Sequence, residues 1–394
     1  MTPPARAQAA IELLDEIIAA AATGAAAADT LIARYFKTRR YAGSKDRRAV
    51  RELVYAAVRR AGERPVSGRA ALLGLAEDRP ELLALFDGSP HAPAMVQPGE
   101  AAAPARLLPA WLEPRLDPLV APDERPALLA RAPLDLRVNR LAGTRDDALQ
   151  AIPEAQPTPL SPLGLRLPDG SKVETLEAWG SGLVEVQDEG SQLLVLACGA
   201  KPGATVIDLC AGAGGKTLAL AAEMANTGRL VACDTDRRRL AQLPERATRA
   251  GVRIAEQRLL DPGKELAMLA ELRGAADLVL VDAPCSGSGT WRRNPETRWR
   301  LTPTRLKQLV EVQARLLDIA AELVRPGGRL AYAVCSLLAD EGRDQAAGFG
   351  RRRSSFVSIG DDMVAGRVAG EGRLLTPGHD GTDGFFVARW RAPC

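Results

Sequence analysis

The stretch Leu278–Gly289, which reads Leu-Val-Leu-Val-Asp-Ala-Pro-Cys-Ser-Gly-Ser-Gly, decides the fold of this chain. Its apolar first half predicts a buried strand of a parallel sheet, because strands covered on both faces are apolar throughout. Pro284 ends the strand, and the glycines after it permit a tight turn. Polar side chains that follow such a strand lie at the carboxyl edge of the sheet, where ligands bind. The pattern therefore brings a carboxylate, Asp282, and a thiol, Cys285, to a candidate site.

Strand and helix patterns alternate on both sides of this stretch, from Val184 onward. We expect strands at Thr205–Leu209, Leu230–Asp234, Val252–Arg258, Asp277–Val281 and Arg329–Val334, and helices at Lys216–Met224, Arg237–Ala250, Glu265–Arg273 and Thr304–Val324. Such alternation predicts an α/β fold with a doubly wound parallel sheet. The segment Gly384–Trp390 would add a late, antiparallel strand.

Apolar residues at helical spacing predict an all-helical domain before the sheet. A Pro-rich segment then reads as a linker, and alternating residues at Leu134–Leu141 predict a strand of a small α+β module. The expected domains are residues 1–90 (helical), 91–130 (linker and helix), 131–183 (small α+β module) and 184–394 (parallel sheet).

The helical region carries a basic, aromatic segment. From Arg34 to Arg60 there are ten Lys or Arg against only Asp46 and Glu52. Guanidinium groups neutralise phosphates and aromatic rings stack on bases, so this is a candidate RNA surface, with Arg39, Arg40, Arg47 and Arg48 as its candidate contacts. The alternative is a solvated helix face whose interleaved aromatics, Tyr35, Phe36, Tyr41 and Tyr55, belong to the core.

Composition narrows the class of protein. The chain has 394 residues and a net charge of +3, and no apolar run approaches the ~20 residues that cross a bilayer. The N-terminus has no signal pattern, so we expect a cytoplasmic protein without membrane contact. Its six cysteines are scattered without a C-x-x-C pair and only two histidines are present, so we expect reduced thiols and no metal.

A glycine-rich turn follows the first strand of the expected sheet, in Asp208-Leu-Cys-Ala-Gly-Ala-Gly-Gly-Lys-Thr217. Such a turn lets backbone N–H groups approach a dinucleotide, a nucleotide phosphate or S-adenosylmethionine. The spacing is neither that of a P-loop nor a strict G-x-G-x-x-G. Asp208 places a carboxylate near the ligand, which would repel a pyrophosphate but suit a cationic amino-acid group.

Further carboxylates follow the next strands. Asp234 is placed to accept from ribose hydroxyls and Asp261 from an adenine amino group. Each alone could be a helix cap or turn residue. Together with Asp208 and Asp282 beside the glycine loop, they favour an adenosyl ligand.

Two thiols end neighbouring strands at this edge, because Cys335 terminates a second apolar run. One reaction uses such a pair. The C5 carbon of cytosine attacks a methyl sulfonium only after a thiolate has added to C6, and a base must then remove the C5 proton. One thiol can be the nucleophile and the other can assist release.

The chain resembles the RNA 5-methylcytosine methyltransferases of the NOL/NOP/Sun family. The resemblance rests on Asp208–Thr217, on Asp282-Ala-Pro-Cys-Ser-Gly-Ser-Gly289 and on Cys335-Ser336. Further similar motifs are Val186-Gln-Asp-Glu-Gly-Ser-Gln192, Arg292-Arg-Asn-Pro295 with Trp299, Pro326-Gly-Gly-Arg329 and Asp383-Gly-Phe-Phe386. Ala339-Asp-Glu-Gly-Arg343 loosely follows the usual Pro-Glu-Glu-Asn. Arg47–Tyr55 and the helical pattern around it resemble the NusB-like RNA-binding domain of the bacterial small-subunit rRNA (RsmB/Sun) group.

This resemblance implies a class I methyltransferase, Rossmann-like fold and methylation of C5 of an RNA cytosine, with ribosomal RNA as the expected partner. It implies that Cys335 is the nucleophile, that Cys285 assists release, and that Asp282 holds the cytosine and touches the cofactor. S-adenosylmethionine would then be bound by Asp234, Asp261 and the loop Cys210, Ala211, Gly212, Ala213, Gly214, Gly215 and Lys216, with Lys216 available for its carboxylate. We expect a monomer.

Two alternatives stay open at this point. A DNA cytosine-5 methyltransferase would use Cys285, the Pro-Cys thiol, as its nucleophile. A non-catalytic RNA-binding assembly factor could retain the fold without the reaction, although the intact Asp282, Cys285 and Cys335 argue against it.

Overall fold

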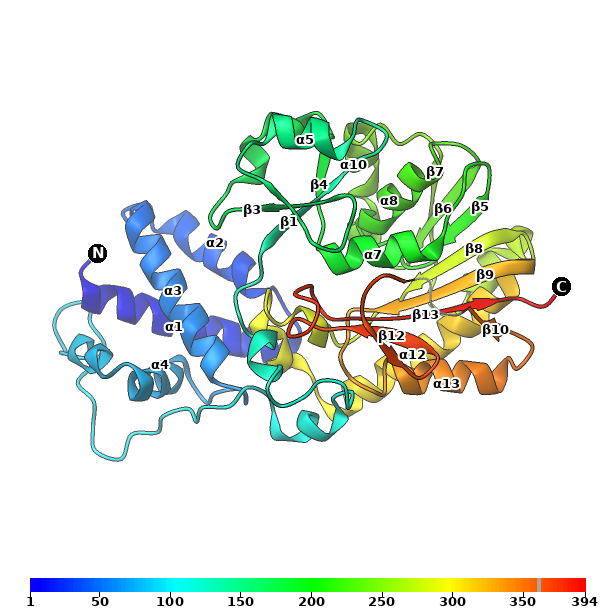
Figure 1. Ribbon diagram of the computed structural model, residues 1–394. Helices are drawn as coiled ribbons and strands as arrows, with labels where there is room; N and C mark the ends of the chain where they lie inside the picture. Colours follow the sequence, from blue (N-terminus) through cyan, green and yellow to red (C-terminus); the bar gives the residue numbers. More distant parts are fainter. Residues whose placement is uncertain (360–362) are drawn as a thin grey trace. The chain divides into compact units, whose positions relative to one another are not determined.

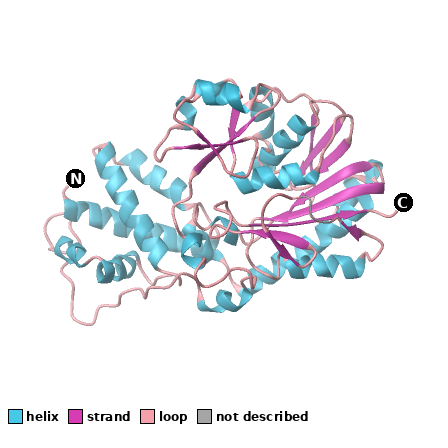
Figure 2. Cartoon of the chain, viewed as in Figure 1, coloured by secondary structure: helices cyan, strands magenta, loops and turns pink. Residues whose placement is uncertain are grey.

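The computed structural model describes residues 1–359 and 363–394. They form two compact units. The first, called the helical unit below, comprises Met1–Leu116, Arg125–Ala130 and Thr290–Arg305. The second, called the sheet unit, comprises Asp117–Glu124, Arg131–Gly289 and Leu306–Cys394. Helices dominate the first unit, and the strands lie in the second (Figure 2).

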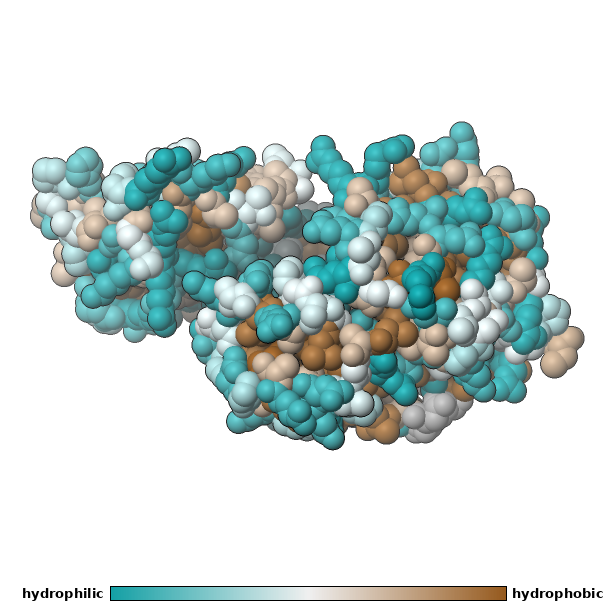
Figure 3. Space-filling model, turned by 90° about the horizontal axis from the view of Figure 1, so that it is seen from above, coloured by the Kyte–Doolittle hydropathy of each residue, from teal (hydrophilic) through white to brown (hydrophobic). Residues whose placement is uncertain are grey.

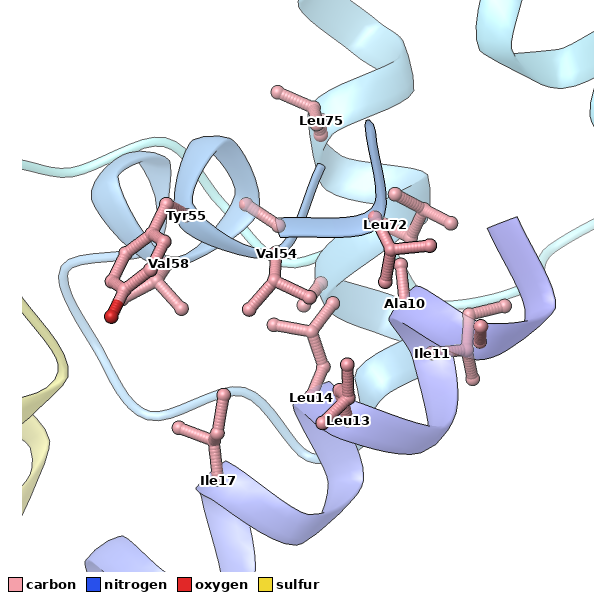
Figure 4. Close-up of a cluster of buried hydrophobic side chains, with 14 of the residues drawn as sticks. Ala10, Ile11, Leu13, Leu14, Ile17, Val54, Tyr55, Val58, Leu72 and Leu75 are labelled. Carbon is pink, nitrogen blue, oxygen red and sulfur yellow. The ribbon is translucent and has the colours of Figure 1, made fainter. Parts of the chain in front are cut away.

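The helical unit is built on helices α1–α4. These are α1 (Pro3–Thr23), α2 (Ala28–Thr38), α3 (Ser44–Arg60) and α4 (Gly68–Asp78), with short 3-10 turns η1 (Pro80–Leu85), η2 (Ala110–Arg115), η3 (Arg125–Leu128) and η7 (Pro295–Arg300). The apolar faces of α1, α3 and α4 meet in one core, where Leu14, Val54 and Leu72 lie close together (Figure 4). Gly68 permits this packing, since a Cβ there would lie 2.2 Å from the carbonyl oxygen of Ile11.

A nine-stranded sheet organises the sheet unit (Figure 1). Its path is β11-β12-β13-β9-β8-β5-β6-β7, and β10 pairs with β13. The strands β5 to β9 run parallel to their neighbours, whereas β13 is antiparallel to β9. The strands are β5 (Thr205–Asp208), β6 (Arg229–Asp234), β7 (Ala255–Leu259), β8 (Ala276–Asp282), β9 (Val324–Val334), β10 (Val357–Ser358), β11 (Arg367–Ala369), β12 (Gly372–Leu375) and β13 (Phe385–Arg391).

Helices cover this sheet on both faces, with α7 and α8 on one side and α12 and α13 on the other (Figure 1). The helices are α7 (Glu189–Cys198), α8 (Gly215–Glu223), α9 (Arg237–Leu240), α10 (Leu243–Arg249), α11 (Glu265–Met268), α12 (Pro303–Leu323) and α13 (Arg343–Arg352), with 3-10 turns η5 (Ala270–Leu272) and η6 (Ser288–Thr290). The predicted doubly wound α/β class is therefore confirmed.

A four-stranded antiparallel sheet in the order β2-β3-β1-β4 precedes the large one in the chain. It consists of β1 (Leu134–Val138), β2 (Gln156–Pro157), β3 (Gly164–Leu167) and β4 (Val184–Val186), with α5 (Arg145–Ala151), η4 (Val173–Thr175) and α6 (Glu177–Gly180). The side chain of Asn139 donates from Nδ2 to the carbonyls of Gly182 and Ala250, each at 2.9 Å, which ties this small sheet to α10.

The structure differs from the sequence-based expectations in several places. The strand expected at Val252–Arg258 begins only at Ala255, and the helix expected at Glu265–Arg273 ends at Met268 and is followed by the 3-10 turn η5. The predicted helix Arg237–Ala250 is broken into α9 and α10, because Pro244 lies in the first turn of α10, where its missing N–H is tolerated and a new helix starts readily. The helical unit is also larger than the expected domain 1–90, and it includes Thr290–Arg305, which is expected in the parallel-sheet domain. The expected small module 131–183 is not a compact unit of its own but belongs to the sheet unit.

One face of the surface can be followed in Figure 3. On the face drawn in Figure 3, hydrophilic residues predominate and hydrophobic ones form smaller patches. Across residues 1–359 and 363–394, no helix combines the length and the apolarity that a bilayer span requires.

Candidate active site

The two thiols singled out from the sequence meet at the carboxyl edge of the large sheet. Strands β8 and β9 are parallel neighbours, with Asp282 opposite Ala333, so Cys285 and Cys335 follow the two strand ends side by side. Their Sγ atoms lie 3.4 Å apart, and both side chains are half-buried. The geometry thus brings together two residues that are 50 positions apart in the chain.

The surroundings of Cys285 disfavour its thiolate. Its hydrogen bond with Cys335, its burial and the negative charge of Glu341 together hold the pKa of Cys285 well above the usual range for a thiol. A positive charge, the ammonium of Lys216, interacts instead with Cys335.

Lys216 also binds the carboxylate of Asp282. Its Nζ lies 2.6 Å from Asp282 Oδ2, and both side chains are largely buried. Burial lowers the pKa of Lys216, but the charge and hydrogen bond of Asp282 outweigh it, so the pKa is raised and the ammonium stays charged. We had expected Lys216 to be available for a cofactor carboxylate, and here one of its donors is engaged by Asp282.

The glycine-rich loop connects β5 to α8. Gly212 and Gly214 have positive φ angles of 57° and 89°, which favour glycine, and a Cβ on either would clash with Arg239 or Leu243. Asp234, at the end of β6, accepts from the backbone N–H of Gly212 at 2.6 Å. A second carboxylate oxygen accepts from the N–H of Asp236 at 2.7 Å. The predicted loop and the predicted carboxylate are thus in direct contact.

Asp208 does not face this site. Its side chain is fully buried, and Oδ2 accepts from the hydroxyl of Thr217 at 2.7 Å. Burial raises the pKa of Asp208 to about 7. The expectation that Asp208 presents a carboxylate to the ligand was wrong, because the side chain turns inward and ties the strand end to the start of α8.

Asp261 lies just beyond β7, and its side chain is exposed. The remaining cofactor candidates follow β5 in the same loop as Gly212 and Gly214; they are Cys210, Ala211, Ala213 and Gly215.

Among residues 1–359 and 363–394, no cluster of His, Cys, Asp or Glu side chains could hold a metal ion.

The basic segment lies in the helical unit, on α2, α3 and the loop between them. Arg39 stacks on Tyr35 at 3.5 Å and pairs with Glu12, and Arg47 donates to the carbonyl of Ala42. Arg40 is exposed, and Arg48 forms an exposed pair with Glu52. Of the four aromatics, Tyr35, Phe36 and Tyr55 are buried and only Tyr41 is exposed. The rings of the buried three therefore belong to the core and are not free to stack on bases.

The sequence analysis missed one group of residues beside the thiols. Glu341 is fully buried and accepts hydrogen bonds from Ser286, Ser336 and Gln313. The only signal in the sequence was an acidic residue shortly after Cys335, in the segment that loosely follows Pro-Glu-Glu-Asn.

A parallel sheet with an antiparallel strand next to β9, a glycine loop after β5 and an acidic residue after β6 together define the class I methyltransferase architecture. The family model described as 16S rRNA methyltransferase RsmB/F matches residues 195–391, half of the chain. The chain therefore belongs to the RsmB/F methyltransferase family.

Individual relatives agree with this assignment. The chain is 33% identical to the ribosomal RNA small subunit methyltransferase B of Photorhabdus laumondii over 66% of its own length and 59% of that protein. It is also 33% identical to the protein of the same name from Salmonella paratyphi B, over 73% of its own length and 67% of that protein. The match thus spans about three fifths to two thirds of these relatives.

A solved structure is similar as well. The crystal structure of a methyltransferase homolog from Pyrococcus horikoshii matches with a TM-score of 0.62 and 27% identity, over 71% of this chain and 92% of that one.

Proposed function

We propose that this protein transfers a methyl group from S-adenosylmethionine to C5 of a cytosine in small-subunit ribosomal RNA, through a covalent bond between Cys335 and C6. The observation that carries the proposal is the contact of Cys285 and Cys335 at 3.4 Å, beside the pair of Lys216 and Asp282. The family and the names of the relatives support the substrate class.

The residues present fit S-adenosylmethionine. The backbone N–H groups at the start of α8 suit its carboxylate, and Asp234 and Asp261 can accept from the hydroxyls and amino group of its adenosine. When bound, it supplies an electrophilic methyl group. Asp234 is already oriented by the N–H groups of Gly212 and Asp236, so little rearrangement is needed to present it.

The two thiols have different roles in the proposed reaction. The Cys335 thiolate adds to C6 of the cytosine, which makes C5 nucleophilic toward the methyl group. A base then removes the C5 proton, and the electrons of that bond expel Cys335 from C6. Because its pKa is raised, Cys285 keeps its proton before the reaction, and it is adjacent to the sulfur that must leave. In this proposal Asp282 holds the cytosine, and its bond with Lys216 keeps that carboxylate in position.

Replacing each thiol tests the division of roles. We expect Cys335→Ala to lose tritium transfer from labelled S-adenosylmethionine by about 10³-fold or more while still binding the cofactor. We expect Cys285→Ala to accumulate a covalent adduct with RNA, visible on a denaturing gel. Cys394→Ala, which removes an exposed thiol, is the control and should behave like the wild type.

The opposite pattern would favour the other enzyme considered above. An adduct from Cys335→Ala but none from Cys285→Ala would make Cys285 the nucleophile, as in DNA cytosine-5 methyltransferases. Bisulfite sequencing of ribosomal RNA from cells with and without this protein identifies the methylated nucleotide, and an unchanged pattern would contradict the proposed substrate.

A further inference from the structure

A buried carboxylate lies directly behind the two thiols. Glu341 follows β9 by a few residues and is fully buried. Its Oε1 accepts from the backbone N–H of Ser286 and from Nε2 of Gln313, each at 2.9 Å. Its Oε2 accepts from the hydroxyl of Ser336 at 2.6 Å and from that of Ser286. Four donors thus converge on one carboxylate, and the hydroxyl of Tyr332 fixes its backbone by donating to the Glu341 carbonyl at 2.7 Å.

The two serines are the residues that directly follow the two cysteines. A single side chain therefore holds the turn after Cys285 and the turn after Cys335 at once. Ser288 reinforces the connection, since its Oγ lies 3.0 Å from Ser336 Oγ and accepts from the N–H of Leu337 at 2.8 Å. These bonds join the ends of β8 and β9 at the point where the two sulfur atoms meet.

The charge of Glu341 acts on the pair unequally. It raises the pKa of Cys285, after the hydrogen bond with Cys335 and burial, whereas Lys216 interacts with Cys335. Tyr332 also interacts with Cys285 and Glu341, and Lys216 is itself paired with Asp282. Because Glu341 acts on one thiol and Lys216 on the other, the two thiols are not equivalent.

We infer that Glu341 is a positioning residue for the proposed reaction: by holding Ser286 and Ser336 it sets the spacing of the two thiols, and its negative charge disfavours a thiolate at Cys285, so that Cys335 is the nucleophile. The inference rests on the proposed function for the roles of the thiols. Glu341 does not itself touch the substrate, and it acts through Ser286 and Ser336.

Two substitutions of Glu341 separate the effect of its charge from the effect of its side-chain length. Glu341→Gln keeps the shape and loses the charge, since the serine hydroxyls can accept from the new amide. Glu341→Asp keeps the charge but is one methylene shorter, so it cannot hold both serines. Glu265→Gln is the matched control, because Glu265 is also a buried carboxylate of the sheet unit but pairs with Arg315 on α12.

The readouts are the rate of methyl transfer to RNA and the pH midpoint for alkylation of Cys285 by iodoacetamide, measured by mass spectrometry on the full chain. We expect Glu341→Gln to lower the midpoint by about half a unit or more. We expect methyl transfer by Glu341→Asp to fall about tenfold, because the thiols are displaced. Glu265→Gln should change neither the midpoint nor the rate of methyl transfer.

Melting curves and cofactor binding report whether each variant folds. If Glu341→Gln does not fold, the rate of methyl transfer by Glu341→Asp is the test.

An unchanged midpoint in a folded Glu341→Gln variant would overturn the inference, and so would a wild-type rate of methyl transfer in Glu341→Asp. Alkylation of Cys285 requires neither RNA nor cofactor. A wild-type protein that transfers no methyl group would therefore contradict the proposed function, while the midpoints would still decide the role of Glu341.

Discussion

Single carboxylates at the carboxyl edge of the sheet serve different purposes according to their surroundings. Asp208 is fully buried against Thr217, so it organises the glycine loop from inside. Asp282 is partly exposed and forms an ion pair with Lys216. Asp234 orients two backbone N–H groups and is almost completely buried. The residue type is the same in all three, and the difference lies in burial and in the partner.

The buried Asp208 makes stability depend on pH. Its pKa of about 7 in the folded protein exceeds the usual 3.8, so its contribution to stability is fully present below about pH 4 and is lost as the pH rises through 7. Asp208→Asn cannot ionise and still accepts from Thr217. From pH 5 to pH 8, we expect the unfolding free energy of this variant to rise relative to the wild type by about 2 kcal/mol.

Denaturant unfolding of the cofactor-free protein at several pH values measures this difference. Asp261→Asn, which changes an exposed carboxylate of the same sheet edge, is the control and should follow the wild type. Parallel curves for Asp208→Asn and the wild type would show that Asp208 is ionised in the folded protein at neutral pH.

At the scale of elements, the segment that follows the Asp282–Gly289 motif belongs to the helical unit. The 3-10 turn η7 docks there through Arg298, which is fully buried and donates to the carbonyls of Val58, Arg59 and Ala61 at the end of α3. Trp299 adds a hydrogen bond from Nε1 to Ala61. These carbonyls lack intrahelical partners, so η7 acts as a C-terminal cap supplied from far along the chain.

Removing this cap should destabilise the helical unit. Arg298→Ala leaves several buried carbonyls without a donor and opens a cavity, so we expect a loss of about 3 kcal/mol or more in unfolding free energy. Hydrogen exchange of the last turn of α3 should accelerate. Arg305→Ala removes an exposed arginine of the same segment and should leave both measurements unchanged. Equal protection of α3 in Arg298→Ala and the wild type would argue against the cap.

Charge at the scale of the whole molecule is nearly balanced, at +3, but its distribution is uneven. The excess of Lys and Arg between Arg34 and Arg60 is concentrated on one part of the helical unit. The structure divides its arginines, because Arg39 and Arg47 help to cover aromatic side chains whereas Arg40 and Arg48 extend into solvent. The latter two are the better candidates for phosphate contacts.

The salt dependence of RNA binding tests this surface. If Arg40 and Arg48 each neutralise one phosphate, Arg40→Ala/Arg48→Ala should weaken binding and reduce the slope of log K against log salt by about 1.5. Arg305→Ala/Lys307→Ala removes the same charge from exposed positions outside the segment. If both double variants lose the same slope, the effect reflects net charge and the segment is an ordinary solvated face.

The sequence by itself determined the class of fold and the central parts of the candidate site. Apolar runs such as Leu278–Val281 predict buried parallel strands because only residues covered on both faces can be apolar throughout, and the glycine loop and the acids that follow the strands are local signals. The boundaries of β5 and β8 were therefore predicted to within a residue.

The tertiary structure decided what depends on contacts between distant segments. It determined that Asp208 turns inward, that Arg298 caps α3, and that Glu341 holds Ser286 and Ser336. None of these follows from periodicity or spacing, because burial and hydrogen bonding are set by which segments pack together. The contact between Cys285 and Cys335 lies between the two cases: the sequence placed both thiols at one edge, and the register of β8 against β9 brought them to 3.4 Å.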